Sequence, residues 1–192
     1  MKTIGLLVLT FILASVCFAQ DAVLENVVVA AVIPQQSSLS VTVSKVTGTT
    51  WTPVSSLEFG NLNYDEANGI FTSDSYFVVD VGILANSPSW SVKFDATSIT
   101  NGSVNLDNNV NVTFMKQVTS TDPGERIAYL SYADSKGKSF VKNAISPGWL
   151  RIYFGIATGD PANPDAPGVS LLTVGTYTVG NYNGNINVTL IP

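Results

Sequence analysis

Every strong hydropathy signal in this chain repeats at every second residue. Apolar and polar side chains alternate from Leu39 to Ser44 and again from Leu150 to Ile156. A period of two is that of a β-strand, whose successive side chains point to opposite faces of a sheet. The best helix candidate, Ser135–Ala144, lacks the apolar residues that a helix face needs. The sequence therefore predicts an all-β protein.

The predicted strands are short and closely spaced. β-Branched and aromatic residues fill them, and Gly, Asn, Asp and Pro stand between them. This spacing favours a single immunoglobulin-like two-sheet sandwich with Greek-key connections over residues 20–192, with a closed barrel as the alternative. The predicted strands are Val23–Ile33, Leu39–Ser44, Leu57–Phe59, Tyr76–Leu84, Trp90–Phe94, Val104–Leu106, Val110–Val118, Ile127–Tyr132, Leu150–Ile156 and Ile186–Leu190.

Residues 1–19 have the layout of a secretory signal peptide. Lys2 precedes an apolar run, Ile4–Leu13, and Ala19 stands where a signal peptidase would cleave, before Gln20. The apolar run is too short to span a bilayer, although an uncleaved anchor is the alternative. We expect a secreted protein, extracellular or on the cell surface, that passes through the periplasm if the source is Gram-negative. After cleavage we expect no integral membrane segment.

The residue inventory limits the chemistry. The one cysteine, Cys17, is lost with the signal peptide, and the chain contains no histidine. Nucleophilic sites of the Ser–His and Cys–His kinds and the ordinary zinc sites are therefore excluded. A carboxylate pair, as in glycoside hydrolysis, stays open, but the acidic residues are scattered and mostly flank turns. We expect a protein without catalytic activity and without a cofactor.

The charge pattern bears on the choice of partner. Charged residues make up 12% of the chain, and the net charge is −5. Such a surface offers no basic patch for nucleic acid or for an anionic membrane. Its polarity must come from Ser, Thr, Asn and Gln, which suits packing against copies of itself or against other surface proteins.

One long loop carries oxygen ligands. Three prolines and two glycines exclude regular structure from Gly159 to Gly168. Asp160, Asn163 and Asp165 could together bind calcium weakly. Turns prefer the same residue types for backbone reasons, so turn formation is the favoured interpretation.

Several aromatic residues could bind a carbohydrate by stacking. Trp51, Trp149 and Tyr182 are the candidates, with Trp51 expected in a loop before Pro53. Trp90 alternates with apolar residues and is expected in the core.

The first predicted strand is apolar on both faces. Such a strand does not suit an exposed edge of a sheet, where it would pair with another chain. It is either a central strand covered on both sides or a strand donated to another molecule. The candidate assembly residues on one face are Val27, Val29, Ala31 and Ile33.

Short motifs along the chain give a family resemblance. Leu57-Glu58-Phe59-Gly60 follows the first strands, Ser89-Trp90-Ser91-Val92 stands in the middle, and a Gly-x-Tyr-x-Gly step, Gly180 to Gly184, leads into the last strand. This combination resembles bacterial surface β-sandwich domains of the WxL-like and fimbrial-subunit kinds. The resemblance implies an immunoglobulin-like fold, display on the cell surface, and adhesion or polymer assembly.

These observations lead to a functional expectation. We expect a secreted, non-catalytic cell-surface structural or adhesive protein, in the form of a fimbria-like assembly subunit. The alternative is a secreted module that binds a carbohydrate or another ligand, with glycans as the partners.

Overall fold

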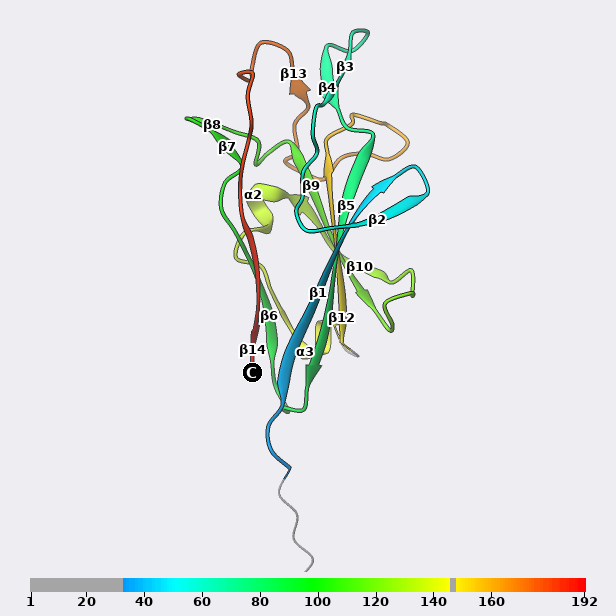
Figure 1. Ribbon diagram of the computed structural model, residues 1–192, viewed down its shortest axis with the longest axis vertical. Helices are drawn as coiled ribbons and strands as arrows, with labels where there is room; N and C mark the ends of the chain where they lie inside the picture. The colour runs from blue at the N-terminus through cyan, green and yellow to red at the C-terminus, as the bar shows by residue number, and fades with distance from the viewer. Residues whose placement is uncertain (1–32, 146–147) are drawn as a thin grey trace, which may run out of the picture. The chain divides into compact units, whose positions relative to one another are not determined.

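Antiparallel strands form nearly all of the regular structure in the part of the chain that this computed structural model describes, residues 33–145 and 148–192 (Figure 1). The all-β prediction is therefore confirmed. The expected signal peptide, residues 1–19, and all of the expected first strand except Ile33 lie outside the described residues. Within the described residues, no helix is long and apolar enough to cross a membrane.

The largest sheet has six strands in the order β10-β9-β12-β5-β1-β2. All neighbouring pairs are antiparallel. Its end strands, β10 and β2, do not pair with each other, so the described residues form an open sheet and not the closed barrel of the alternative. The six strands are β1 (Ser37–Thr47), β2 (Thr50–Val54), β5 (Ser75–Ala85), β9 (Val110–Gln117), β10 (Glu125–Ser131) and β12 (Trp149–Ile156).

Three smaller sheets and two short helices complete the described structure. One sheet has the order β11-β6-β14, a second has the order β13-β4-β3, and a third is the pair β7-β8. Their elements are β3 (Asn63–Asp65), β4 (Ile70–Thr72), β6 (Ser91–Ala96), β7 (Thr100–Asn101), β8 (Val104–Asn105), α2 (Tyr132–Ser135), β11 (Ser139–Val141), α3 (Lys142–Ile145), β13 (Leu172–Thr173) and β14 (Ile186–Ile191).

The six-stranded sheet and the sheet around β6 share one hydrophobic core. Phe94 of β6 is fully buried, and its ring centroid lies 5.4 Å from that of Phe114 in β9 and 6.1 Å from that of Phe154 in β12. Phe140 of β11 packs on Phe114 at 4.9 Å. Trp90 is 6% exposed and belongs to this core, as predicted.

The long alternating runs are strands as predicted, and one short run is not. Leu57–Phe59 has no ladder partner and is irregular. Both of its apolar side chains still pack against the core, and the Phe59 ring meets the Phe77 ring edge-on at 5.0 Å. The run was apolar because it covers the core, not because it belongs to a sheet.

Trp51 also lies in an unexpected place. It belongs to β2, not to a loop, because a tight turn at Gly48 (φ 58°) folds β2 back along β1. Pro53 fits in β2 because this strand lies at the end of the sheet, where one missing N–H costs no ladder bond.

The closing strand has the predicted register but is only half-buried. Ile186, Val188 and Leu190 pack against the core, and they alternate with the exposed Asn187 and Thr189. β14 pairs with β6 along one side and is the end strand of its sheet. The apolar side of β14 is therefore incompletely covered by the described residues.

This register can be tested with two neighbouring substitutions. We expect Val188→Asp to lower the free energy of unfolding by about 2 kcal/mol or more, because it places a carboxylate against the core opposite Phe94. Thr189→Asp should stay within about 0.5 kcal/mol, since its side chain faces solvent and its neighbour across the ladder is Lys93. Thermal melting of both variants measures the difference, and equal losses would contradict the register.

Candidate functional sites: an open edge and an aromatic sheet face

The edge where β1 and β14 approach each other is open. β2 pairs with β1 only over Val43–Thr47, so the first half of β1, Ser37–Thr42, has no strand along that side among the described residues. β14 pairs with β6 and, in the described chain, with no other strand. β1 and β14 lie close together but are not joined by a ladder.

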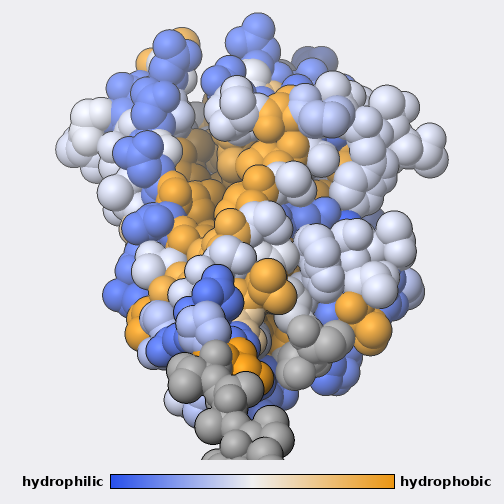
Figure 2. Space-filling view, turned by 60° about the horizontal axis from the view of Figure 1, so that its bottom comes forward, coloured by the Kyte–Doolittle hydropathy of each residue, from blue (hydrophilic) through white to orange (hydrophobic). Residues whose placement is uncertain are grey.

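Apolar side chains line this open edge. On β1, Leu39 and Val43 are half-buried and Val41 is 49% exposed, although all three occupy the positions that face the core. The inward side chains of β14 are half-buried as well. Figure 2 shows an apolar groove between more hydrophilic sides, on the face of the molecule that this view brings forward. Unpaired backbone beside apolar side chains is what the addition of a strand requires.

Two hydrogen bonds continue the β1–β5 pairing just before β1. The N–H of Gln36 donates to Asn86 Oδ1 and the Asn86 N–H donates to the Gln36 carbonyl, so the β1–β5 pairing extends one residue beyond the strand. Residues 33–36 are all exposed, and the Ile33 side chain is 83% exposed. Among the predicted assembly residues, Val27, Val29 and Ala31 lie outside the described residues.

The outer face of the six-stranded sheet carries a row of aromatic residues. Leu150, Ile152 and Phe154 of β12 are buried in the core, so the side chains between them point to the opposite face. Register places side chains from β5 and β2 on that same face. The aromatic residues in this row are Trp149 and Tyr153 from β12, Tyr76 from β5 and Trp51 from β2, and the charged Arg151 and Asp80 lie among them.

An ion pair holds the centre of this outer face. Arg151 donates from Nε to Asp80 Oδ1 at 2.5 Å and from Nη2 to Asp80 Oδ2 at 2.9 Å. The same Nη2 donates to the Ser120 carbonyl, and the guanidinium carbon lies 5.2 Å from the centroid of the Trp51 ring. The hydrogen bonds to Asp80 raise the pKa of Arg151 above its usual value. The pair is thus locally neutral and fixed in position.

Two valines lie on the same face and are fully buried. Val46 is 0% exposed and Val78 is 1% exposed, although neither belongs to the main core. The larger side chains around them must therefore cover them. Tyr76 and Tyr153 are neighbours, with ring centroids 6.1 Å apart, and burial raises the pKa of Tyr76. Some aromatic surface nevertheless stays in contact with solvent, since Tyr76 is 37% exposed.

Trp149 borders a hollow on the same sheet. The hollow has a volume of about 370 Å³ and is lined by residues of β1 and β5 as well as by Trp149. Gly82 stands opposite Trp149 in the ladder, and a Cβ at this position would come within 2.9 Å of Trp149 Cη2. The glycine therefore lets the indole lie directly against the backbone of β5.

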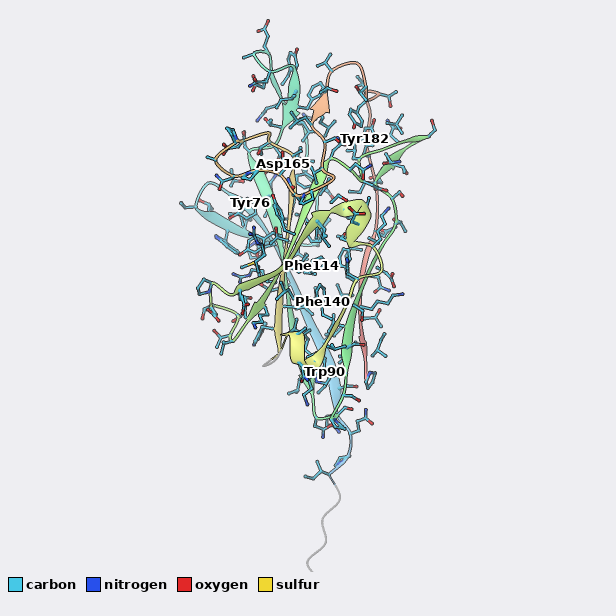
Figure 3. The ribbon with its side chains drawn as sticks, turned by 180° about the vertical axis from the view of Figure 1, so that it is seen from behind. Tyr76, Trp90, Phe114, Phe140, Asp165 and Tyr182 are labelled. Atoms are coloured by element: carbon cyan, nitrogen blue, oxygen red, sulfur yellow. The ribbon has the colours of Figure 1, made fainter. Side chains whose placement is uncertain are left out.

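The structure brings together two of the three aromatic candidates. Trp51 and Trp149 share the outer face, while Tyr182 lies beside the C-terminal segment, away from Tyr76 (Figure 3). The Tyr182 hydroxyl donates to the Thr178 carbonyl at 2.9 Å, which ties down its own loop. Sequence reasoning missed Arg151, although the alternation from Trp149 through Arg151 to Tyr153 is readable in the sequence.

The long loop has the irregular structure that was predicted, and its polar residues serve the backbone. Asp165 accepts hydrogen bonds from the N–H groups of Thr158 and Gly159 and from Asn111 Nδ2. Asp160 accepts from the Ala162 N–H and from Asn163 Nδ2, and the first of these lowers its pKa most. In the described parts of the chain, no three acidic, histidine or cysteine residues are grouped to hold a metal ion. The structure thus uses these residues in turns.

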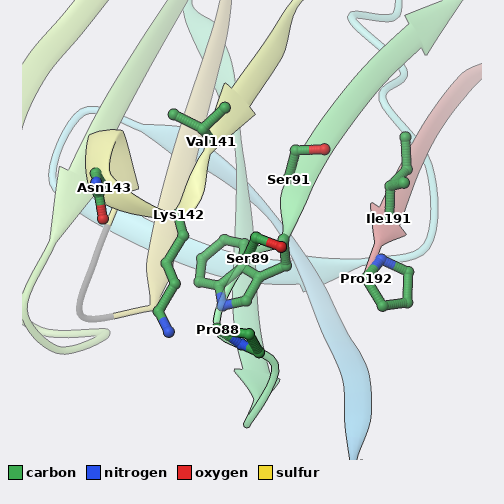
Figure 4. Close-up of a pocket in the computed structure, with 9 residues that line it drawn as sticks. Pro88, Ser89, Ser91, Val141, Lys142, Asn143, Ile191 and Pro192 are labelled. Atoms are coloured by element: carbon green, nitrogen blue, oxygen red, sulfur yellow. The ribbon is translucent and has the colours of Figure 1, made fainter.

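A second hollow lies where β14 ends, beside Trp90 (Figure 4). Its volume is about 320 Å³, and it holds no acidic side chain. Lys142 lines it, and its Nζ donates to the Ser87 carbonyl at 3.0 Å. The Trp149 hollow has no acidic side chain either, so neither hollow contains a carboxylate pair for glycoside hydrolysis.

Comparison with known proteins gives no family for this chain. It matches no protein-family model, no curated protein and no solved structure.

Proposed function

We propose that this chain is a secreted, non-catalytic structural or adhesive protein of the cell surface and that it assembles with copies of itself as a fimbria-like subunit. Its fold in this proposal is an immunoglobulin-like sandwich with Greek-key connections, as the resemblance to WxL-like and fimbrial-subunit domains implies. The observation that carries the proposal is the open apolar edge between β1 and β14.

The occupant of this edge in the proposal is Val23–Ile33 of a second copy. This segment is long enough to cover Ser37–Thr42 and β14, and its alternate residues supply an apolar face. Each valine or isoleucine that leaves water contributes about 1.5–3 kcal/mol, so several such residues give a stable contact. The added ladder would also satisfy N–H and C=O groups that are unpaired at both strands.

The proposal places this segment on a second copy. Insertion of Val23–Ile33 into the edge of its own molecule is the alternative, and the oligomeric state distinguishes the two.

The proposal predicts the oligomeric state. The chain that begins at Gln20 should form linear oligomers, and a variant without Val23–Ile33 should be folded and monomeric. Size-exclusion chromatography with light scattering, followed by negative-stain electron microscopy, measures both. Equal assembly of the two chains would contradict strand donation. The proposal would also be contradicted by a full chain that is monomeric and in which the amides of Ser37–Thr42 and β14 are already protected from hydrogen exchange.

A matched pair of substitutions locates the contact. Val41→Asp places a charge on the exposed apolar side of β1 and should abolish assembly, whereas Ser38→Asp on the opposite face of β1 should not. A synthetic peptide of residues 22–33 should bind the shortened chain and slow hydrogen exchange in Ser37–Thr42 and β14. Protection elsewhere would show that the edge is not the binding site.

A further inference from the structure

We propose that the outer face of the six-stranded sheet binds a neutral polysaccharide, which lies across the aromatic residues of β12, β5 and β2. This inference goes beyond assembly, because the aromatic residues lie on the outer face of the sheet, whereas the apolar side chains of the open edge lie on its inner face. A subunit could therefore use both surfaces at once. The aromatic residues of these three strands on this face are Trp149, Tyr153, Tyr76 and Trp51, and Tyr129 of β10 lies farther along the same face.

The aromatic content of this face exceeds what the fold needs. The solvent side of an antiparallel sheet is usually polar. Any large side chains could cover Val46 and Val78, the two buried valines on this face. Here Trp51 stays 44% exposed and Tyr76 stays 37% exposed. Tyrosine and tryptophan combine an apolar ring with a polar group, which suits surfaces that bind ligands. Their clustering from three strands indicates a binding surface.

The chemistry of the face fits a sugar better than other polymers. Aromatic rings pack well against the C–H faces of a pyranose, and hydroxyl groups can bond to its hydroxyls. Next to the aromatic row, β1 presents Ser38, Ser40 and Thr42, all exposed on the same side of the sheet. A surface with rings and hydroxyls side by side offers both kinds of contact.

The charges point to a neutral polymer. The cation at the centre of the face, Arg151, is bound by both oxygens of Asp80. Arg126 of β10 lies farther out on the same face, where its guanidinium carbon is 5.3 Å from the centroid of the Tyr129 ring. An acidic polysaccharide or a nucleic acid would need cations that are free to pair with it. The protein as a whole is also acidic, with a net charge of −5. A neutral chain has no such electrostatic penalty.

The face is also ordered before binding. Asp80 and the Ser120 carbonyl fix the guanidinium of Arg151, which in turn supports the Trp51 ring. Gly82 seats the Trp149 indole against the sheet beside the hollow. Rings that are held in place lose little conformational entropy when a ligand binds.

Affinity electrophoresis of the chain that begins at Gln20 tests the inference. The gels contain one of four neutral polysaccharides (hydroxyethyl cellulose, arabinoxylan, galactomannan or laminarin) or, as the acidic comparison, alginate. We expect at least one neutral polymer to retard the protein and alginate not to. Trp149→Ala and Trp51→Ala should each weaken retardation about tenfold, and Trp149→Tyr should restore most of it.

Controls separate loss of binding from loss of fold or of assembly. Tyr64→Ala removes a tyrosine that is 52% exposed on β3, away from this sheet, and should leave retardation unchanged. Circular dichroism and light scattering confirm that each variant is folded and has the same oligomeric state. The inference is overturned if no neutral polymer retards the protein, if alginate alone does, or if the Trp51→Ala/Trp149→Ala double variant binds as the parent does.

Discussion

Phe94→Ala should lower the free energy of unfolding by about 3–5 kcal/mol, which is a large part of the stability of a typical domain. Phe94 is 0% exposed and its ring contacts both Phe114 and Phe154. Truncation therefore leaves a cavity where the six-stranded sheet and the sheet around β6 meet. Without a disulfide, this shared core is the main link between the two sheets. Equilibrium unfolding in urea, followed by circular dichroism, measures the loss.

A phenylalanine at the margin of the core serves as the matched control. Phe71 in β4 is half-buried, and its ring contacts the exposed Tyr64 at 5.4 Å. Phe71→Ala should cost less than half as much as Phe94→Ala, because solvent already reaches the site and little cavity remains. Similar losses for the two variants would show that Phe94 is not central to the packing between the sheets.

Strong alternation over many residues was enough to predict the main strands. β1, β5, β9, β12 and β14 each contain a long run in which apolar residues fall on one side, and the core selects that side. The smaller strands carry no such run. β3 and β4 are three residues each, and their pairing depends on the turn between them, in which Asp65 accepts from the Ala67 N–H. A local turn, instead of a long alternating run, defines their pairing.

The sequence does not show which candidate residues share a face. Trp51 and Trp149 were candidates for stacking on a carbohydrate, but their common face depends on strand order, which sequence periodicity does not contain. The Arg151–Asp80 pair joins positions 71 residues apart. It arises because β12 and β5 are neighbours in the sheet. In the same way, the open edge depends on the closeness of β1 and β14, which the sequence does not show. Donation of Val23–Ile33 to this edge stays a prediction.

The two proposed surfaces use different side chains of β1. Its inward residues, Leu39, Val41 and Val43, are left partly uncovered at the open edge, and its outward hydroxyls border the aromatic face. A strand added beside β1 would extend the sheet edge and cover these inward residues without touching the outward hydroxyl groups. Assembly by this route would therefore repeat the aromatic face along the polymer. A weak contact to a polysaccharide chain would then become a multivalent one.

Arg151→Met should destabilise the protein by about 3–5 kcal/mol, since it leaves the Asp80 carboxylate without its partner on a largely covered part of the sheet. The two side chains are only 11% and 16% exposed. The double variant Arg151→Met/Asp80→Leu should recover most of the loss, because it removes the charge as well as its partner. Urea unfolding of the parent, both single variants and the double variant forms a complete thermodynamic cycle. A double variant no more stable than Arg151→Met would mean that the arginine acts through its contact with Trp51 and not through Asp80.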